Sequence, residues 1–485
     1  MACSKMTTRE FLKGTAWMGV VAAASGCTSG LRRGSGGTMA GFAMKPVPRI
    51  RVGIIGVGNR GIGAVHRLTM VPGVEVAAVC DNRPEVMPRA RNWFDERKLG
   101  RPREFGGDEG WKALCDWDGV DVVYIATPWA LHAPMALRAL RGGKVALVEV
   151  PGAVTVDECW EIVETSESLR LPCMMLENCC YGEMELLGLN LVRKGLLGEI
   201  IHGEGGYIHD LRRICTEPPS RDNEAVWRYN EDMVHKGNRY PTHGLVPIMQ
   251  AMDINRGDRF DYLVSLESKP ANFHEFMQHV RIEGPQKATD FPQMGDMNVT
   301  MIKTALGRSV MVQHDVSSPR PYSRINLISG TKGVFWGLPH LKPDGSEAFK
   351  VAFEREFGDR GAHLFFDDAK AEEVRRVHAH PMWAQVGEIS KKVGGHGGMD
   401  FVMDLRWAYC LQNGLPLDMD VYDLAAASCL CELTETSVRS RSRTMDVPDF
   451  TRGGWRTAKP LGIERFDMSK IRLDGIGVDN AALSV

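Results

Sequence analysis

The stretch Arg51–Gly61 reads R-V-G-I-I-G-V-G-N-R-G and decides the fold of the first domain. An apolar strand, Ile50–Ile55, leads directly into Gly56, Gly58 and Gly61, and a helical pattern follows. In this setting the first glycine permits a tight turn, the second lets the backbone approach a pyrophosphate, and the third lets the helix pack on the strand. The helix N-terminus then faces the anion. The stretch therefore predicts a dinucleotide-binding turn.

An acidic residue at the end of the next strand supports this interpretation. The apolar run Val74–Val79 ends in Cys80 and Asp81, at the distance where a carboxylate meets the adenosine ribose hydroxyls. Asp81 would repel a 2′-phosphate, which favours NAD over NADP, although Arg83 lies close by. The alternative is a glycine-rich turn that binds no ligand.

Length and charge limit the class of protein. The chain has 485 residues, and at roughly 150 residues per domain this length indicates two or three domains. The formal net charge is −2, so we expect no nucleic-acid partner. No apolar run reaches the roughly 20 residues of a membrane span.

The N-terminus has the features of an export signal. Lys5 and Arg9 precede the apolar run Ala16–Ala24, and a segment rich in Gly and Ser follows to Gly41. We therefore interpret residues 1–44 as an export signal and flexible linker, which predicts a periplasmic or secreted protein. The segment around Arg9 resembles a twin-arginine signal that lacks its first arginine. Two alternatives are a lipoprotein anchored at Cys27, in A-S-G-C, and a disordered cytosolic leader.

The cysteines show no framework spacing. Ten of the twelve follow Cys27, and none shows the paired spacing of disulfides or of zinc ligands. We expect small buried hydrophobic residues and no metal. Free thiols are unusual in an oxidising compartment, and this conflict with export stays open.

Residues 45–178 alternate between strands and helices. The helix from Asp157 begins with a capping box, Thr155 and Glu158. Near-continuous apolar strands that alternate with helices indicate a doubly wound parallel sheet. The expected strands are Ile50–Ile55, Val74–Val79, Val120–Thr127, Val145–Glu149 and Cys173–Glu177.

The pattern changes after Asn178. A helix is expected at Glu183–Arg193, and two more around Asp400–Gln412 and Asp420–Ser437. Strand-like stretches separated by polar loops indicate an open, mostly antiparallel sheet, so residues 179–445 are predicted to form a second, α+β domain. Residues 446–485 form a tail. The expected strands are Glu199–Tyr207, Tyr262–Leu266, Asn298–Thr304, Ser309–Asp315 and Arg324–Gly330.

Chemically useful residues recur at two places. Polar or small residues follow each strand of the first domain, where such sheets bind ligands, although each alone has an ordinary explanation in turns or packing. In the second domain, Tyr240 and His243 lie three apart in the block Gly237–Gly244 and can share a helix face. Histidine titrates near neutrality and is a natural proton carrier. The alternative is a simple capped helix start after Pro241.

Several segments resemble a known family. The domain order is similar to the Gfo/Idh/MocA oxidoreductase superfamily, with a Rossmann domain followed by an open-sheet domain. Within it the chain closely resembles glycoside hydrolase family 109, the NAD-dependent α-N-acetylgalactosaminidases. The segments that carry the resemblance are VGIIGVGNRG, IATPWALHAPMA, VEVPGAVTVDECW, GNRYPTHG, GGHGGMDFV, NGLPLDMDVYDLAA and PDFTRGGW, and they span nearly all of the chain after the leader.

Two positions of this chain depart from these patterns. The dehydrogenases of the superfamily usually carry Glu-Lys-Pro, with the lysine as acid/base, whereas this chain has Glu149-Val150-Pro151. Valine cannot move a proton, so sugar-alcohol oxidation by that route is disfavoured; the glycosidase branch shares this loss. Within the family motif, Val246 replaces a usual glycine, and we expect only local packing to change.

The resemblance implies a set of site residues. The glycines of the turn would hold NAD together with Asn59, Arg60, Asp81, Trp129, Ala130, Leu131, His132, Glu149, Val150 and Asn178. The sugar would be bound by Tyr207, Arg228, Tyr240, Pro241, Thr242, His243 and Tyr322. The catalytic candidates are His243, Tyr181 and Tyr240, with the choice of acid and base left open.

The resulting hypothesis is an exported glycosidase that releases terminal α-linked N-acetylgalactosamine. NAD would oxidise C3 of the sugar transiently, and the aglycone would leave by elimination. Water would then add to the sugar, and NADH would give the hydride back. The substrate is a small glycan or glycoside, and we expect a homo-oligomer. The alternatives are an NAD(P)-dependent sugar or inositol dehydrogenase and a non-catalytic NAD-holding sensor.

Overall fold

The first domain is built on a parallel sheet of six strands. In this computed structural model, which describes residues 37–216, 226–279, 292–343, 346–354 and 363–471, the strand order is β3-β2-β1-β4-β5-β6. All neighbouring strands pair in parallel, which confirms the predicted doubly wound sheet. The strands are β1 Ile50–Ile55, β2 Val74–Asp81, β3 Arg103–Gly106, β4 Val122–Ile125, β5 Val145–Val148 and β6 Cys173–Met175.

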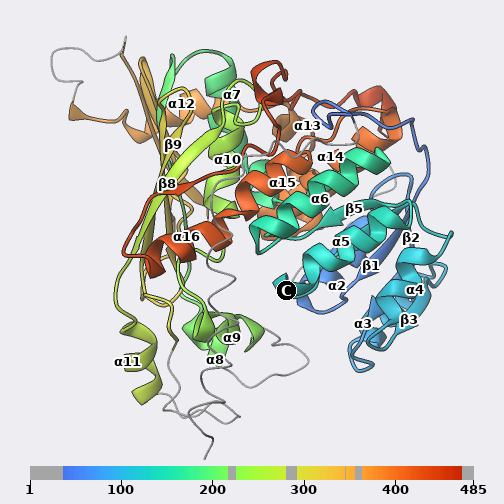
Figure 1. Ribbon diagram of the computed structural model, residues 1–485. Coiled ribbons are helices and arrows are strands. Elements are labelled where there is room, and N and C mark those ends of the chain that lie inside the picture. The colour runs from blue at the N-terminus through green and yellow to red at the C-terminus, as the bar shows by residue number, and fades with distance from the viewer. Residues whose placement is uncertain (1–36, 217–225, 280–291, 344–345, 355–362, 472–485) are drawn as a thin grey trace, which may run out of the picture. The chain divides into compact units, whose positions relative to one another are not determined.

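Helices connect these strands. Figure 1 shows α5 and α6 lying side by side along sheet strand β5. The capping box predicted at Thr155 and Glu158 is present at the start of α6. The helices are α2 Asn59–Leu68, α3 Met87–Glu96, α4 Gly110–Asp116, α5 His132–Arg141 and α6 Val156–Leu169.

The glycine turn has the predicted geometry. Gly56 has a φ of +86°, in the region that favours glycine. A Cβ on Gly61 would lie 1.7 Å from the carbonyl oxygen of Gly56, so only glycine lets α2 approach β1 this closely. The backbone N–H of Gly56 donates to the carbonyl of Cys80, which fixes the turn next to the end of β2.

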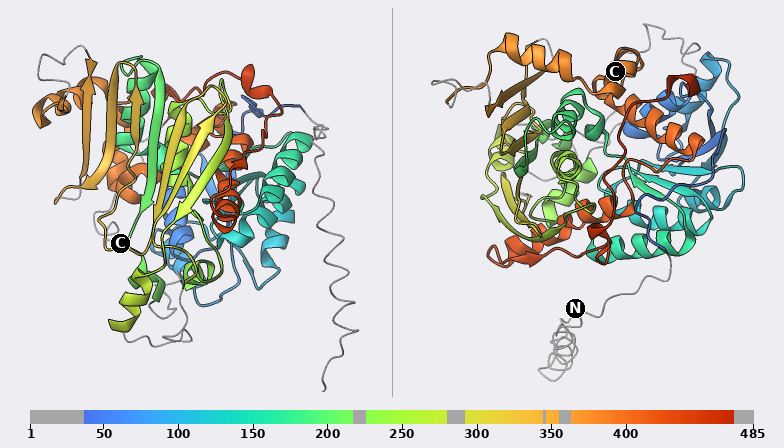
Figure 2. Two further views of the ribbon diagram at one scale, coloured as in Figure 1. Left: turned by 60° about the vertical axis from the view of Figure 1, so that its left-hand side comes forward. Right: turned by 90° about the horizontal axis from the view of Figure 1, so that it is seen from above.

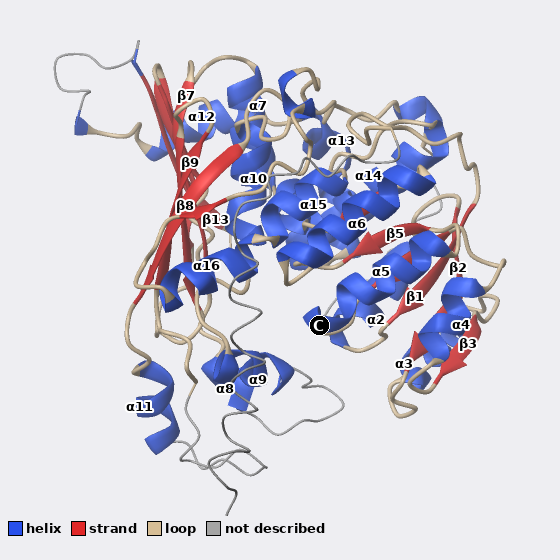
Figure 3. Ribbon diagram, viewed as in Figure 1, coloured by secondary structure: helices blue, strands red, loops and turns tan. Residues whose placement is uncertain are grey.

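The second domain is built on a sheet of eight strands, in the order β13-β12-β11-β7-β10-β9-β8-β14. Only β7 and β10 pair in parallel; the other pairs are antiparallel. The strands are β7 Ile200–Ile208, β8 Phe260–Glu267, β9 Asn298–Thr304, β10 Ser309–Asp315, β11 Leu327–Gly330, β12 Gly333–Leu341, β13 Glu347–Phe353 and β14 Met445–Asp446. Figure 3 shows the two sheets as separate groups of strands.

One face of this second sheet is covered by helices. Helix α10 packs against β7, and α7 packs against β12. The left view of Figure 2 looks onto the other face, where no described helix lies in front of β7–β10. The helices of this half are α7 Glu183–Arg193, α8 Arg212–Thr216, α9 Val226–Val234, α10 Thr242–Ala251, α11 Asn272–His279, α12 Asp368–His378, α13 Pro381–Val393, α14 Met399–Asn413, α15 Val421–Ser428 and α16 Leu430–Arg439.

Helices of the predicted second domain contact helices of the first. Helices α14 and α15, placed by the sequence in the second domain, pack against α2 and α6 of the first. Arg67 of α2 donates to Asp404 of α14 at 2.7 Å. The C-terminal tail also begins as a strand, since β14 pairs with β8.

Three predictions from the sequence concern the leader, membrane-spanning helices and the cysteines. Residues 1–36 of the predicted signal and linker, including the anchor candidate Cys27, lie outside the described residues. The prediction of a flexible linker is wrong for residues 37–44, because Met39 is buried and its backbone N–H donates to the hydroxyl of Tyr422 at 3.1 Å. None of the described helices has the length and hydropathy needed to cross a membrane. The ten cysteines from Cys80 onward are all buried free thiols, as predicted.

Candidate active site

A cavity of about 760 Å³ lies at the C-terminal edge of the parallel sheet. Eleven of the predicted cofactor residues line it, and they come from the ends of successive strands. They are Gly56, Gly58, Asn59, Arg60, Asp81, Trp129, Leu131, His132, Glu149, Val150 and Asn178. Gly61 lies behind the turn, and Ala130 does not line the cavity. The second domain contributes Tyr207, Arg228, Tyr240 and His243 to the same cavity.

Asp81 serves the glycine turn as well as the cavity. Its Oδ2 accepts a hydrogen bond from the backbone N–H of Val57 at 2.9 Å, and its Oδ1 accepts from the N–H of Arg83 at 2.9 Å. The carboxylate is thus fixed beside the pyrophosphate turn, where it can also accept from ribose hydroxyls. Helix α2 has no acidic residue in its first turn, so its N-terminus is free of negative charge.

Arg60 is held by two carboxylates from distant parts of the chain. Its Nε donates to Glu149 at 2.6 Å, and its Nη1 donates to Asp400 at 2.6 Å. Asn178 donates to the other oxygen of Asp400 at 2.6 Å. Burial alone would raise the pKa of Asp400, but the guanidinium groups of Arg60 and Arg67 hold it well below its usual range. Asp400 therefore organises the cofactor end of the cavity.

His132 joins two loops. Its Nδ1 lies 2.6 Å from the carbonyl oxygen of Pro151, and its Nε2 lies 2.7 Å from that of Thr127. Burial lowers the pKa of His132, and the two carbonyls oppose that shift. Because both ring nitrogens are engaged, His132 fixes the loops that follow β4 and β5 around the cavity.

Tyr240, His243 and Glu177 form a hydrogen-bonded chain on the second-domain side. The Tyr240 hydroxyl lies 3.2 Å from His243 Nε2, and His243 Nδ1 lies 2.6 Å from Glu177 Oε1. Burial would raise the pKa of Glu177, but the hydrogen bond and charge of His243 lower it overall. The ionised Glu177 accepts from Nδ1–H, which directs the Nε2 lone pair of His243 toward Tyr240 and the cavity.

Glycine at two positions brings this chain to the sheet. A Cβ on Gly244 would lie 2.1 Å from the backbone N of Gly206, and a Cβ on Gly205 would lie 2.0 Å from the carbonyl oxygen of Gly244, so α10 lies directly on β7. The Tyr207 ring then lies 4.7 Å from that of Tyr240 and 5.5 Å from that of His243. Val246, the departure from the family motif, is buried on the same helix.

Arg228 is a positively charged residue on the second-domain side of the cavity. Its guanidinium lies 5.1 Å from the Trp129 ring, 4.9 Å from Trp227 and 5.1 Å from Tyr240, within cation–π range. Two further histidines stay neutral here, because burial and the charge of Arg228 lower the pKa of His209 to about 4 and of His314 to about 3.

The remaining predicted sugar residues lie behind the cavity wall. The Tyr322 ring lies 6.4 Å from Tyr207 and 5.0 Å from His209, and its hydroxyl accepts from Arg324 at 3.3 Å. Pro241 is the N-cap of α10, and Thr242 is its buried first residue. These three support the residues that line the cavity.

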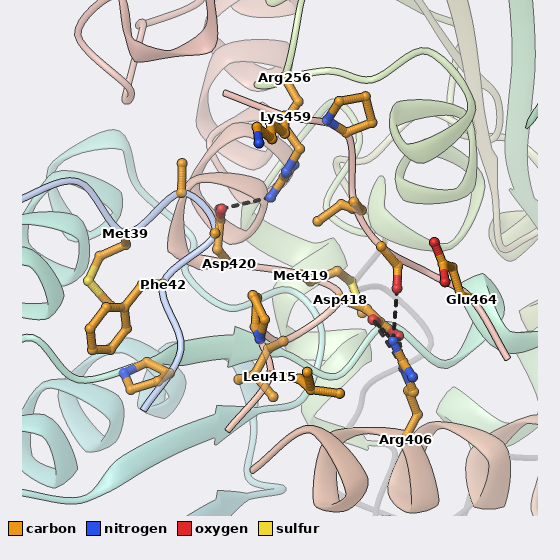
Figure 4. A pocket seen from close by; sticks show the side chains of 18 of the residues that line it. Met39, Phe42, Arg256, Arg406, Leu415, Asp418, Met419, Asp420, Lys459 and Glu464 are labelled. Atoms are coloured by element: carbon orange, nitrogen blue, oxygen red, sulfur yellow. Dashed lines mark hydrogen bonds and ion pairs between the residues drawn. The ribbon is translucent and has the colours of Figure 1, made fainter. Parts of the chain in front are cut away.

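The structure does not bring Tyr181 to this cavity. Its buried hydroxyl donates to Asp418 at 3.3 Å. Asp418 lines a second cavity of about 1250 Å³, shown in Figure 4, in which Arg406 points at Asp418 and Arg256 at Asp420. Asp418 thus holds the hydroxyl of Tyr181 on the side of the second cavity, and His243 and Tyr240 remain as the predicted proton-transfer groups.

Several residues at the site were not among the predicted site residues, and four of them matter for the chemistry. Glu177 ends the segment after β6 and was visible only as a neighbour of Asn178. Trp227 and His396 line the cavity, and Asp400 anchors Arg60. Among the described residues, one group of side chains could ligate a metal ion, and it consists of Glu177, Cys179 and His243. The hydrogen bond between Glu177 and His243 already explains why these two side chains lie close together.

Comparisons with known proteins identify the family of each domain. A family described as "Oxidoreductase family, NAD-binding Rossmann fold" matches residues 50–176. A family described as "Glycosyl hydrolase 109, C-terminal domain" matches residues 181–457. Together the two matches cover both domains, and the match to an NAD-binding family supports NAD as the cofactor of this protein.

Two relatives match over nearly their whole length. The "Glycosyl hydrolase family 109 protein 2" of Shewanella sp. (strain MR-4) is 43% identical over 462 residues, covering 94% of this chain and 98% of the relative. The "Alpha-N-acetylgalactosaminidase" of Shewanella oneidensis is 42% identical over 464 residues, with the same coverage. These identities confirm the resemblance seen in the sequence motifs.

Solved structures share the fold at low identity. A levoglucosan dehydrogenase in complex with NADH and levoglucosan aligns with a TM-score of 0.56 and 17% identity, covering 83% of this chain and 100% of that one. An oxidoreductase domain protein from Kribbella flavida aligns with a TM-score of 0.58 and 18% identity, with the same coverage. The likeness confirms the two-domain architecture.

Proposed function

Since this chain belongs to glycosyl hydrolase family 109, we propose that it is an NAD-dependent glycoside hydrolase that releases terminal α-linked N-acetylgalactosamine. The observation that carries the proposal is one cavity that joins a dinucleotide turn to the chain Tyr240–His243–Glu177. The name of the Shewanella oneidensis relative supports the choice of sugar and anomer.

The cofactor end of the cavity fits NAD. The glycine turn and the uncharged first turn of α2 suit a pyrophosphate, and Asp81 suits an unmodified ribose. Arg60, Glu149 and Asn178 would hold the remainder of the dinucleotide. When bound, NAD supplies reversible hydride acceptance, which permits hydrolysis of a sugar without net oxidation.

Proton transfer falls to the second-domain residues. Glu177 holds His243 in the tautomer whose Nε2 accepts a proton, so His243 is placed to deprotonate the sugar hydroxyl at C3. A carbonyl at C3 makes the hydrogen at C2 acidic, and the pair Tyr240–His243 would remove it. Loss of that proton expels the aglycone from C1, and water adds at the same carbon. Arg228 and Tyr207 would bind and orient the sugar.

Direct displacement by two carboxylates fits the site less well. Three carboxylates of the described residues line the cavity, and all three are engaged. Asp81 accepts from the glycine turn, Glu149 accepts from Arg60 at 2.6 Å and Tyr124 at 3.0 Å, and Asp108 accepts from Asn82 at 3.1 Å. The usual glycosidase pair needs one carboxyl as acid and another as base or nucleophile. A redox-neutral route through C3 needs neither.

A dehydrogenase with net oxidation is the alternative suggested by the fold. Val150 lines the cavity where the superfamily's dehydrogenases place their lysine, and its side chain cannot carry a proton. Hydride could still be lost to NAD if His243 alone served as base. The two activities therefore differ in whether NADH accumulates.

One assay separates these functions. Purified protein would be mixed with chromogenic α- and β-N-acetylhexosaminides, and absorbance followed at the wavelengths of the aglycone and of NADH. We expect aglycone release from the α-galactosaminide without accumulation of NADH. Stoichiometric NADH would indicate a dehydrogenase, and bound NAD without any turnover would indicate a sensor.

Export is part of the same proposal. The charge and apolar pattern of residues 1–44 supports a cleaved signal of twin-arginine type, with a lipoprotein anchored at Cys27 as the alternative. Intact-mass measurement of the protein from fractionated cells would separate the two, because only the lipoprotein carries acyl chains on Cys27. A full-length cytosolic protein would contradict export.

A further inference from the structure

The end of the cofactor cavity next to Asp81 is formed by the loops that follow β2 and β3. These strands pair in parallel and end together, with Asp81 opposite Gly106. Figure 1 shows β3 and α4 at the outer edge of the parallel sheet. Both loops contribute to the cavity, with Asn82 and Arg83 after β2 and Gly107, Asp108 and Trp111 after β3.

A glycine and a side-chain hydrogen bond hold these two loops together. A Cβ on Gly110, the first residue of α4, would lie 3.4 Å from Sγ of Cys80, so α4 begins close to the end of β2. Asn82 Nδ2 donates to Asp108 Oδ1 at 3.1 Å, which joins the loops directly. Helix α4 therefore brings Trp111, its second residue, to the same end of the cavity.

Apolar residues line the cavity on both sides of the glycine turn. Trp111 is half-buried and comes from the side of β2 and β3, whereas Leu131 and Met135 follow β4, on the other side of β1. Leu131 is 42% exposed, which is high for a large apolar residue. A flat apolar group bound between the two sides would remove this surface from water.

The order of the groups in NAD determines which part of it reaches Trp111. The pyrophosphate fits the glycine turn, the adenosine ribose fits Asp81, and the nicotinamide must reach the sugar site around Tyr240. Adenine is attached to the ribose at Asp81, on the side away from the sugar. The other two tryptophans of the cavity belong to the sugar end, since the Trp129 ring lies 4.8 Å from that of Trp227 and 5.5 Å from that of Tyr240.

We propose that Trp111 binds the adenine of NAD by stacking its indole ring on the base. The inference rests on NAD as the cofactor in the proposed function, and not on the reaction carried out with it. Stacking on an aromatic ring stabilises a bound base without hydrogen bonds to its edge. The adenosine half is the same in the oxidised and reduced cofactor. Trp111 thus retains both forms equally, as a reaction that returns its hydride requires.

A purely structural role for Trp111 is the alternative, and the same helix supplies a control for it. Trp111 packs partly against the hydrophobic core, and Lys112 Nζ lies 5.5 Å from its ring. Trp117, which follows the last residue of α4, is also half-buried against the core, with its ring 5.9 Å from that of Phe105. Trp117 does not line the cavity, so its removal tests the loss of packing alone.

The test measures the affinity of the full-length protein for parts of the cofactor. Radiolabelled NAD bound to the protein would be displaced by unlabelled NAD, by ADP-ribose, which lacks nicotinamide, and by nicotinamide mononucleotide, which lacks adenine. We expect Trp111→Ala to weaken binding of NAD and of ADP-ribose by about 5- to 150-fold and to leave that of nicotinamide mononucleotide unchanged. Trp111→Phe, which keeps an aromatic ring, should lose less than about fivefold. Trp117→Ala should bind all these nucleotides as the wild type does.

The outcomes separate the role of Trp111 from the proposed function. Unchanged affinity of Trp111→Ala for ADP-ribose would overturn the role, and so would an equal loss for nicotinamide mononucleotide, because Trp111 would then shape the whole cavity. Thermal unfolding shows whether the variant folds; if it does not, Trp111→Leu, which keeps apolar bulk, is judged by the same criteria. A wild-type protein that binds these nucleotides as expected but cleaves no glycoside would support the role of Trp111 and refute the proposed function.

Discussion

Three side chains fix the chemistry of His243 at the scale of single residues. Glu177 accepts from one ring nitrogen at 2.6 Å, Tyr240 lies 3.2 Å from the other, and Tyr207 packs against the ring. Glu177 is completely buried, and its Oε1 also accepts a hydrogen bond from the backbone N–H of Cys179 at 3.1 Å. The geometry makes Glu177 a positioning residue that sets the tautomer of the base.

Glu177→Gln should therefore damage turnover more than binding. The amide of Gln carries no negative charge and does not hold His243 in a single tautomer as the carboxylate does. We therefore expect kcat to fall by about 10²–10⁴ with little change in NAD affinity. Steady-state kinetics and calorimetry would measure the two effects. Glu167→Gln, a buried glutamate that binds Tyr422 and Arg452, is the control for burial alone.

A double variant makes this test sharper. If Glu177 acts through His243, then Glu177→Gln combined with His243→Ala should be no slower than His243→Ala alone, because residues that act as a unit are not additive. Additive losses would show that Glu177 has a separate role.

Asp81 should determine the choice of dinucleotide. Asp81→Ala removes the ribose acceptor and the hydrogen bond to Val57 N–H, and we expect NAD to bind about 10- to 150-fold more weakly, the equivalent of about 1.5–3 kcal/mol. Asp81→Asn, which keeps an acceptor for Val57, separates the two contributions. Tighter binding of NADP than of NAD by the wild type would contradict the assignment.

At the scale of elements, the features predicted best are those that depend on residues close together in the sequence. The glycine turn, the capping box at Thr155 and the apolar strands of the parallel sheet were all predicted, because each depends on neighbours in sequence. Strand β3, R-E-F-G, was missed because it is a polar edge strand with one buried residue. The partnership of Arg60 with Asp400 joins residues 340 positions apart, and no spacing indicates it.

Helix α9 contributes two residues to the cavity and also buries an aspartate. It presents Trp227 and Arg228 to the cavity, and one turn after Arg228 it buries Asp232. Burial raises the pKa of Asp232 to about 7, although Arg228 and Arg239 oppose the shift. The folded state thus holds a proton on Asp232 that the unfolded chain releases near pH 4.

Stability should depend on pH through this residue. Because the folded pKa is raised, the stabilisation is fully present below pH 4 and is lost as pH rises through about 7. Asp232→Asn mimics the protonated form, so we expect it to match the wild type near pH 4 and to be more stable by about 1–4 kcal/mol at pH 8. Thermal unfolding at both pH values measures this, with exposed Asp118→Asn as control. An equal difference at both pH values would contradict it.

At the scale of the whole molecule, the C-terminal half completes the first domain. Helices α14 and α15 return to pack on α2 and α6. The loop before α14 brings His396 to the cofactor cavity, and Asp400 in the first turn of α14 accepts a hydrogen bond from the cavity residue Arg60. The predicted boundary at residue 178 does not indicate these contacts, because they join residues that are far apart in the sequence. The cavity therefore depends on the whole chain.

The uncovered face of the second sheet is the predicted site of self-association. Tyr262 and Leu266 of β8 and Met301 of β9 are 40%, 64% and 43% exposed, and Met301 pairs with Val264 and with Met311 of β10. We expect Leu266→Glu with Met301→Glu to convert a homo-oligomer to monomers, measured by size-exclusion chromatography with light scattering. Leu169→Glu on α6 is the control. A wild-type monomer would contradict this prediction.

The fate of the C2 hydrogen tests the redox-neutral mechanism most directly. A transient carbonyl at C3 requires that the C2 hydrogen leave before the aglycone does and that a solvent proton replace it. An α-N-acetylgalactosaminide would be hydrolysed in deuterated water and the released sugar examined by NMR and mass spectrometry. The mechanism predicts deuterium at C2 of every sugar released and no accumulation of NADH. Released sugar that keeps its original C2 hydrogen would contradict it and indicate direct displacement at C1.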